Sequence, residues 1–215
     1  MRTRTLALTA AAALGLVLGA AGQAGASTGG VLTVGSAGGT DVNVGDTLSG
    51  AINSDFVFTT SSGTIDCSTG QFTAGVTANP AVGGNAIESI SQLHADPANC
   101  TTTVSGTIGV VSVEINGAAT GTVVGGASPT LKVTGLYEQV TLSSFLGNVT
   151  CDYGTTGSVT EIDGSLSNTT NAISFATQNV NLISGSGLCP SSGTFQGGVG
   201  PVLDTNQSSQ ATFVN

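Results

Sequence analysis

Two copies of a short phrase, Gly-x-x-x-Cys-x-x-Gly, constrain this chain more than any other feature of its sequence. The first copy spans residues 63–70 and contains Cys67, and the second spans residues 147–154 and contains Cys151. In both copies the residue two positions before the cysteine is Ile or Val, which shares a face with the cysteine on a strand. The flanking glycines favour turns. The phrase therefore predicts a short strand, bounded by turns, that a disulfide joins to a partner strand.

The order of the four cysteines predicts how they pair. An Asn-Ala-Ile marker follows each phrase, at 85–87 and 171–173, and another cysteine follows each marker. Four cysteines allow three pairings. Because like units are expected to pair internally, we predict the disulfides Cys67–Cys100 and Cys151–Cys189.

The first 26 residues have the pattern of a secretory signal peptide. Arg2 and Arg4 precede an apolar run over residues 6–21, and Ala24-Gly25-Ala26 forms a small-x-small cleavage site. We therefore expect a mature chain of residues 27–215, secreted to the extracellular space, with no membrane anchor after cleavage. Such an oxidising environment is where structural disulfides persist.

The charge balance excludes two classes of partner. After removal of the signal peptide, Lys132 is the single Lys or Arg against twelve Asp and Glu residues, which gives a net charge of −11. Nucleic-acid binding requires Lys and Arg to neutralise phosphates, so we expect no nucleic-acid partner. Attraction to an anionic membrane surface fails for the same reason. The acidity favours solubility through mutual repulsion, and attraction of a cationic ligand is the alternative reading.

Apolar and polar residues alternate with the period of two that is typical of half-buried strands. Clear runs lie at 111–115, 131–134 and 211–214, and a further run at 41–44 ends at Gly45-Asp46. Asn116-Gly117 is a turn signal after the first of these runs. Residues 86–95 also fit helical spacing, but they align with 171–182, which has the pattern of a strand, so we predict a strand there.

These patterns predict one all-β domain over residues 27–215. We expect a sandwich or flattened barrel of about a dozen short antiparallel strands. The repeated phrase predicts two pseudo-equivalent halves, at about 31–120 and 121–215, each with one disulfide.

The mature chain offers few groups for catalysis or metal binding. Its one histidine is His94, and it has no arginine or tryptophan. We predict no catalytic, cofactor-binding or metal-binding residue. Calcium at Asp41 and Asp46, or at Glu161 and Asp163, is the one metal alternative, although neither pair has EF-hand spacing. We expect Glu114 and Glu138 to lie on the solvated side of their strands.

The chain resembles a group of small exported actinobacterial proteins with a signal peptide, two disulfides and a Gly/Thr/Val-rich β body. The segments that carry this resemblance are the leader, VTANPAVGG at 76–84, SGSGLCPSSGTF at 184–195 and the terminal FVN. The resemblance implies localisation and fold class only. A looser similarity is to neocarzinostatin-type apoproteins, which are secreted acidic β-sandwiches that carry an apolar chromophore. The cysteine spacings here are wider, so no residue is carried over.

The sequence thus leads to a secreted, non-enzymatic β-scaffold of structural or binding role. One alternative is an extracellular carrier of a small apolar ligand, with Phe and Tyr side chains lining its cavity. Another is a hydrolase of unrecognised type. Strands this rich in Thr and Val, with little charge, also make self-association a further expectation, and the sequence identifies no protein partner.

Overall fold

The computed structural model describes residues 29–115 and 117–215. The predicted signal peptide and Asn116 of the predicted turn lie outside this part of the chain. The described residues form antiparallel strands and a single short 3-10 helix, η1 (Pro97–Asn99), with no α-helix among them. The all-β prediction is confirmed.

The strands are more numerous than predicted, and two of them, β3 and β14, run for 14 residues each. In chain order they are β1 (Leu32–Val34), β2 (Thr40–Asp41), β3 (Thr47–Thr60), β4 (Gly63–Cys67), β5 (Gly70–Ala78), β6 (Asn85–Ala95), β7 (Cys100–Thr102), β8 (Thr107–Ile115), β9 (Ala119–Val124), β10 (Thr130–Thr134), β11 (Tyr137–Ser144), β12 (Gly147–Gly154), β13 (Ile162–Ser167), β14 (Ala172–Gly185), β15 (Ser192–Val199), β16 (Leu203–Asp204) and β17 (Gln210–Val214).

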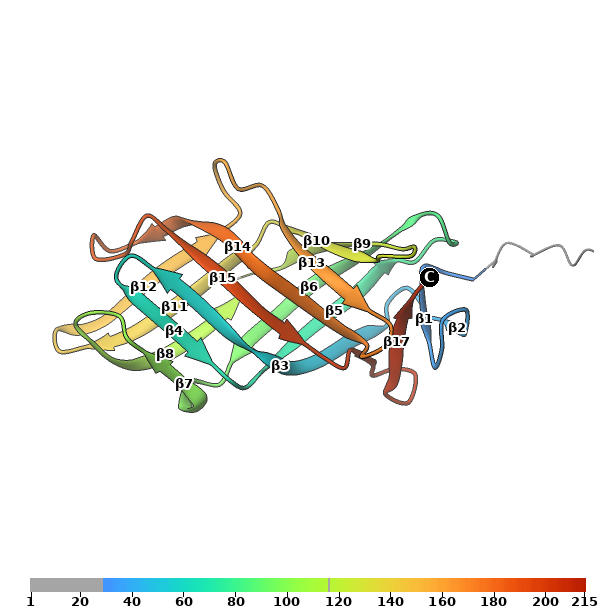
Figure 1. Ribbon diagram of the computed structural model, residues 1–215, viewed down its shortest axis with the longest axis horizontal. Helices are drawn as coiled ribbons and strands as arrows, with labels where there is room; N and C mark the ends of the chain where they lie inside the picture. Colours follow the sequence, from blue (N-terminus) through green and yellow to red (C-terminus); the bar gives the residue numbers. More distant parts are fainter. Residues whose placement is uncertain (1–28, 116) are drawn as a thin grey trace, which may run out of the picture.

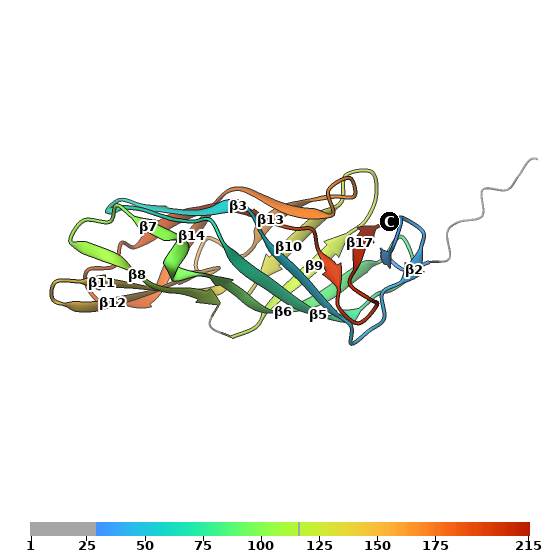
Figure 2. The same ribbon diagram turned by 90° about the horizontal axis from the view of Figure 1, so that it is seen from below.

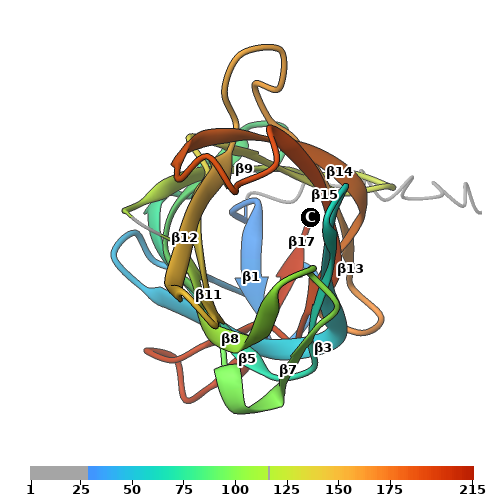
Figure 3. The ribbon, with the colours of Figure 1, turned by 90° about the vertical axis from the view of Figure 1, so that its left-hand side faces the viewer.

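Eight of these strands form a closed ring. The ladder runs from β3 through β5, β6, β9, β10, β13, β14 and β15, and β15 pairs back onto β3. Viewed along the long axis of the molecule, the strands surround a common interior (Figure 3). The fold is therefore a flattened barrel, the second of the two predicted architectures.

The long strands carry the wall onward to a second section of the barrel. There β4 pairs with the C-terminal part of β3, and β8, β11 and β12 continue the wall round to β14. The end of β6 joins β8, and β7 pairs with β4. The molecule is consequently elongated, with the hairpins of β3–β4, β7–β8 and β11–β12 at one end (Figures 1 and 2).

The opposite end is closed by a small group of strands near the C-terminus (Figure 1). Strand β1 pairs with β17 and β2, and Leu32 of β1 is fully buried. The side-chain amide of Asn168 hydrogen-bonds both backbone groups of Val214, and Asn171 donates to the carbonyl of Thr212. These amides fix β17 to the turn between β13 and β14. We call this end the plugged end.

Aromatic rings fill the middle of the barrel. Phe195 of β15 packs against Phe56 of β3 and Phe175 of β14, with ring centroids 5.3 and 5.6 Å apart. Phe58 packs on Tyr153 at 4.7 Å. Edge-on and tilted contacts of this kind are favourable for aromatic pairs. Strands that are far apart in the sequence are thus joined by side chains as well as by the ladder.

The structure confirms some predicted strands and corrects another. Residues 86–95 lie in β6, 131–134 in β10 and 211–214 in β17, as expected. The strand expected over 41–44 is wrong, because β2 ends at Asp41 and Val44 is exposed. The carboxylate of Asp46 accepts hydrogen bonds from the backbone and side chain of Asn43, which turns the chain at this point.

Both predicted disulfides are present, Cys67–Cys100 and Cys151–Cys189. Cys67 and Cys100 are direct partners in the ladder between β4 and β7, whereas Cys189 lies in the loop after β14. Strands from the two predicted halves also pair with each other, as β3 does with β15. The division into pseudo-halves stays a prediction.

The ring of Phe58, which packs on Tyr153, also lies close to the backbone of Gly193 on β15. We therefore expect Gly193→Ala to destabilise the protein. A Cβ atom at this position would lie 2.6 Å from Cζ of Phe58 and 3.0 Å from the carbonyl oxygen of Thr59. Overpacking of this kind costs about 1–3 kcal/mol, measurable as a lower urea midpoint by circular dichroism. Gly75→Ala on β5 is the matched control, since a Cβ there has no atom within 4 Å. Equal stability of the two variants would contradict this packing.

Candidate ligand cavity

The barrel is hollow at the end opposite the plug. A cavity of about 470 Å³ lies there between β3, β4, β11 and β12 and the loops that follow β3, β7, β11 and β14. Its walls are made by apolar side chains that point inward from alternate strand positions, including Ile65, Val140, Leu142 and Val149. Ligand sites are concave, mostly apolar and typically about 300–1,000 Å³ in volume, so this cavity has the size and the lining of one.

An aromatic pair closes the inner end of the cavity. Tyr153 and Phe58 both line it, and Tyr153 is the ladder partner of Glu138, two residues deeper along β11 than Val140. The Tyr153 hydroxyl donates a hydrogen bond to the carbonyl of Pro190 at 3.0 Å. Burial raises the pKa of this hydroxyl to about 12. The floor is therefore uncharged at any physiological pH.

A disulfide forms part of the cavity wall. Cys151 lines the cavity, and its bond to Cys189 ties β12 to a loop that contributes Leu188 and Pro190 to the lining. A crosslink that closes a long loop restricts the unfolded chain, here by roughly 3–4 kcal/mol in the chain-entropy model. In the folded state it also fixes one side of the cavity mouth.

The carboxylate of Asp152 lies on the outer side of this wall. Asp152 follows Cys151 on β12, and its carboxylate accepts hydrogen bonds from Ser184 and Gln139. Burial opposes ionisation of Asp152, but these hydrogen bonds outweigh it and hold its pKa below the usual value. The negative charge is thus held outside the apolar lining.

Large apolar side chains are exposed around the cavity mouth. Leu146 is 96% exposed, Phe145 83% and Leu188 70%, and all three also border the cavity. Sequence reasoning missed these residues. The signal was present in Ser144-Phe145-Leu146-Gly147, where a tight turn between strands carries two large apolar residues in place of the usual polar ones.

Glu138 lies inside the barrel, so the prediction that it faces solvent is wrong. It points inward with Val140 and Leu142 and borders a cavity of about 30 Å³ among Phe72, Phe175 and Phe195. Burial raises its pKa to about 7. The expectation rested on the preference of carboxylates for water, whereas the two-residue period counted back from Val140 places Glu138 inside.

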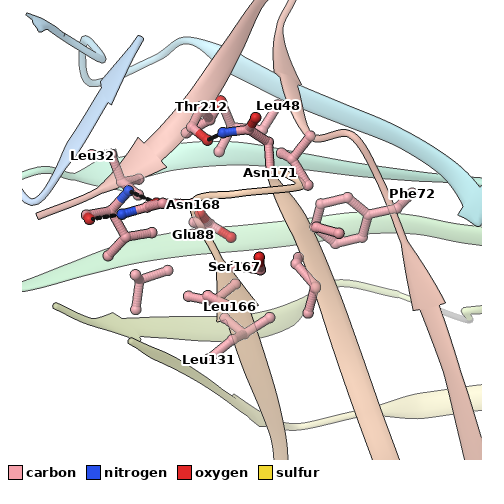
Figure 4. Close-up of a pocket in the computed structure, with 15 residues that line it drawn as sticks. Leu32, Leu48, Phe72, Glu88, Leu131, Leu166, Ser167, Asn168, Asn171 and Thr212 are labelled. Carbon is pink, nitrogen blue, oxygen red and sulfur yellow. Dashed lines mark hydrogen bonds between the residues drawn. The ribbon is translucent and has the colours of Figure 1, made fainter. Parts of the chain in front are cut away.

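Glu88 is a second buried carboxyl group, nearer the plugged end. It points from β6 into another space of about 30 Å³, where Figure 4 shows it close to Ser167 and Asn168 among apolar side chains. Burial raises its pKa to about 7 as well. A space of this size has room for only one or two water molecules, so it is too small for a ligand.

The other residues considered from the sequence do not converge on a site. His94 points out of β6 opposite Glu114 of β8, away from the cavity. Glu161 and Asp163 flank Lys132, with oxygens 2.5 and 3.6 Å from its Nζ. The Asp46 carboxylate is held by Asn43 and Gln207. Residues 29–115 and 117–215 contain no group of three or more His, Cys, Asp or Glu side chains able to hold a metal ion.

Comparison of the chain with models of known protein families, with curated proteins and with solved structures found no match. The resemblance to exported actinobacterial proteins therefore stays a prediction. In the described residues, no helix is long and apolar enough to cross a membrane. The two disulfides are consistent with an extracellular protein.

The buried carboxyls predict that the protein loses stability as the pH rises from about 5 to about 8. In the folded state Glu88 and Glu138 keep their protons up to about pH 7, whereas in the unfolded chain they lose them near 4.5. The folded state binds more protons in this window, so the free energy of unfolding falls as the pH rises through it. The shift corresponds to on the order of 3 kcal/mol for each group.

Thermal denaturation across this pH range would measure the effect. Glu88→Gln and Glu138→Gln should each flatten the pH dependence and raise the melting temperature most at the alkaline end. Glu114→Gln, on the exposed side of β8, is the control and should leave the slope unchanged. A wild-type protein whose stability rises with pH over this window would contradict the burial of these two carboxyls.

Proposed function

We propose that the protein is a secreted, non-enzymatic binding protein that carries a small apolar molecule in the cavity at the open end of its barrel. The observation that supports this proposal is the 470 Å³ apolar cavity bordered by Phe58, Phe145 and Tyr153. An eight-stranded barrel has an interior just wide enough to be filled by side chains or to hold one small ligand. Here side chains fill the middle and leave the open end unfilled.

The lining indicates the class of ligand. An engineered apolar cavity of about 150 Å³ is enough to bind benzene, and this cavity is roughly three times as large. Its deep walls offer aliphatic and aromatic contacts, and hydroxyl groups such as those of Ser62, Ser105 and Thr107 lie toward the mouth. The geometry suits a neutral apolar molecule with its polar end toward solvent. At about 0.3 kcal/mol per non-hydrogen atom, a ligand of about 20 such atoms would bind with a dissociation constant on the order of tens of micromolar.

The absence of an enzymatic role is also part of this proposal. The cavity lining contains no His, Asp, Glu or Lys side chain, and its one titratable group, the Tyr153 hydroxyl, is hydrogen-bonded and neutral. His94 is the one histidine of the expected mature chain, and its side chain points outward from β6, away from the cavity. General acid–base catalysis needs a titratable group within hydrogen-bond reach of the substrate, which this cavity does not offer.

We expect the protein to bind Nile red, a neutral apolar dye, saturably and with one site. Leu142→Trp should weaken this binding at least about tenfold, because the larger side chain fills part of the cavity. Val44→Trp is the matched control, since Val44 is exposed in the turn before β3, outside the cavity. The wild-type chain has no tryptophan, so a blue-shifted emission of the introduced indole would show that it occupies the cavity.

Native mass spectrometry of protein purified from culture supernatant provides the second test. A co-purifying apolar molecule that Leu142→Trp loses would support the proposal. A protein that is always empty, and that takes up no Nile red, would contradict it. Turnover of esterase, glycosidase or protease substrates that His94→Ala abolishes would instead favour the hydrolase alternative.

A further inference from the structure

The four loops around the cavity mouth share one local hydrogen bond. In each, a Ser or Thr hydroxyl accepts the backbone N–H two residues later. The pairs are Thr60 with Ser62 (3.2 Å), Thr102 with Val104 (3.1 Å), Ser144 with Leu146 (3.2 Å) and Ser186 with Leu188 (3.3 Å). The four hydroxyl residues are spaced 42 positions apart. These four backbone N–H groups are thus paired within the protein and need no water.

Two of the residues whose N–H is bonded in this way, Leu146 and Leu188, are among the most exposed apolar side chains of the described chain. Phe145, next to Leu146, is exposed as well. The Ser144 hydroxyl also donates to the carbonyl of Gly147 at 2.7 Å, which satisfies both ends of that turn. We call the four loops, residues 60–63, 102–107, 144–147 and 184–193, the tip. Its large apolar side chains, Phe145, Leu146 and Leu188, are exposed.

The tip carries no charge, in contrast to the rest of the protein. Its residues include no Asp, Glu, Lys, Arg or His, although the expected mature chain has a net charge of −11. At the plugged end, Asp41, Asp46 and Asp204 gather around the turn that holds Gln207. The tip can therefore leave water without taking a charged side chain of its own out of it.

We propose that the tip docks on a lipid bilayer with zwitterionic headgroups, with Phe145, Leu146 and Leu188 entering the boundary between headgroups and acyl chains. Burial of exposed apolar side chains drives such interfacial binding. In lipid an unpaired backbone N–H is costly, and the Ser hydroxyls that accept the N–H groups of Leu146 and Leu188 remove that cost. A docked tip would place the cavity mouth against the lipid. This docking is a separate function from the ligand binding proposed above.

A deformable lipid surface fits the tip better than a second copy of the chain does. Phe145 and Leu146 stand on the β11–β12 hairpin and Leu188 on the loop between β14 and β15, and all three border the cavity. The loops at this end project separately (Figure 3). Two such tips facing each other would meet only at their projections and leave the cavity mouths between them. Lipid headgroups adapt to separate projections. The net negative charge of the body also predicts a preference for zwitterionic over anionic lipid, because anionic lipid repels it.

The test is co-sedimentation of the mature protein with phosphatidylcholine vesicles. Wild-type protein should bind, and the double variant Phe145→Ser/Leu146→Ser should bind at least about tenfold more weakly. The matched control is Val44→Ser/Val82→Ser, which removes two exposed apolar side chains outside the tip and should bind like wild type. Replacing part of the phosphatidylcholine by phosphatidylglycerol should weaken binding at low salt, and added salt should restore it.

This design tests vesicle binding and ligand binding in the cavity separately, because different variants are expected to abolish each. Leu142→Trp should lose Nile red binding and keep vesicle binding, because Leu142 is buried inside the cavity. Wild-type protein that does not bind phosphatidylcholine, or a tip variant that binds as well as wild type, would overturn the docking proposal. A dimer that forms without lipid and is lost in Phe145→Ser/Leu146→Ser would assign the tip to self-association and would also overturn it.

Discussion

Pairing between β15 and β3 is the interaction on which the rest of the structure depends. A sheet without helices can cover its inner face only with a second sheet or by closing on itself. The ladder between β15 and β3 closes the ring, with Phe195 opposite Phe58. It joins strands more than a hundred residues apart, removes two long sheet edges that would otherwise be open to other chains, and creates an enclosed interior. The core, the buried carboxyls and the cavity all follow from this closure.

The interior is used differently along the axis of the barrel. In the middle, the rings of Phe56, Phe175 and Phe195 fill it, and close approach of Phe58 to Gly193 depends on a position without a Cβ. At the plugged end, β1 and β17 are tied in by asparagine amides. At the open end the wall strands continue, and their inward side chains, such as Ile65, Val140 and Val149, line the interior without filling it. The cavity is thus the unfilled end of a closed sheet.

Much of the fold could be predicted from the sequence, because disulfide units and period-two patterns are local. The repeated cysteine phrase predicted both disulfides, and alternation predicted β8, β10 and β17. The prediction for Glu138 failed because the water preference of one side chain was given more weight than the period of its neighbours Val140 and Leu142. A cavity lined by Phe and Tyr was an alternative from the sequence, but its position and volume could not be predicted, since they depend on which distant strands meet. The two copies of the cysteine phrase do begin directly after two of the loops at this end, at Gly63 and Gly147.

The difference between the two ends bears on how a ligand would exchange. At the plugged end, entry would require breaking ladder hydrogen bonds and the amide contacts of Asn168 and Asn171. At the open end, β7 pairs with β4, and β8 pairs with β6 and β11. Strands β7 and β8 meet through the hydroxyls of Thr102 and Thr107 at 3.4 Å. Strands β4, β7, β8, β11 and β12 lie outside the eight-stranded ring, so exchange through the cavity mouth would leave the pairing of the closed ring intact.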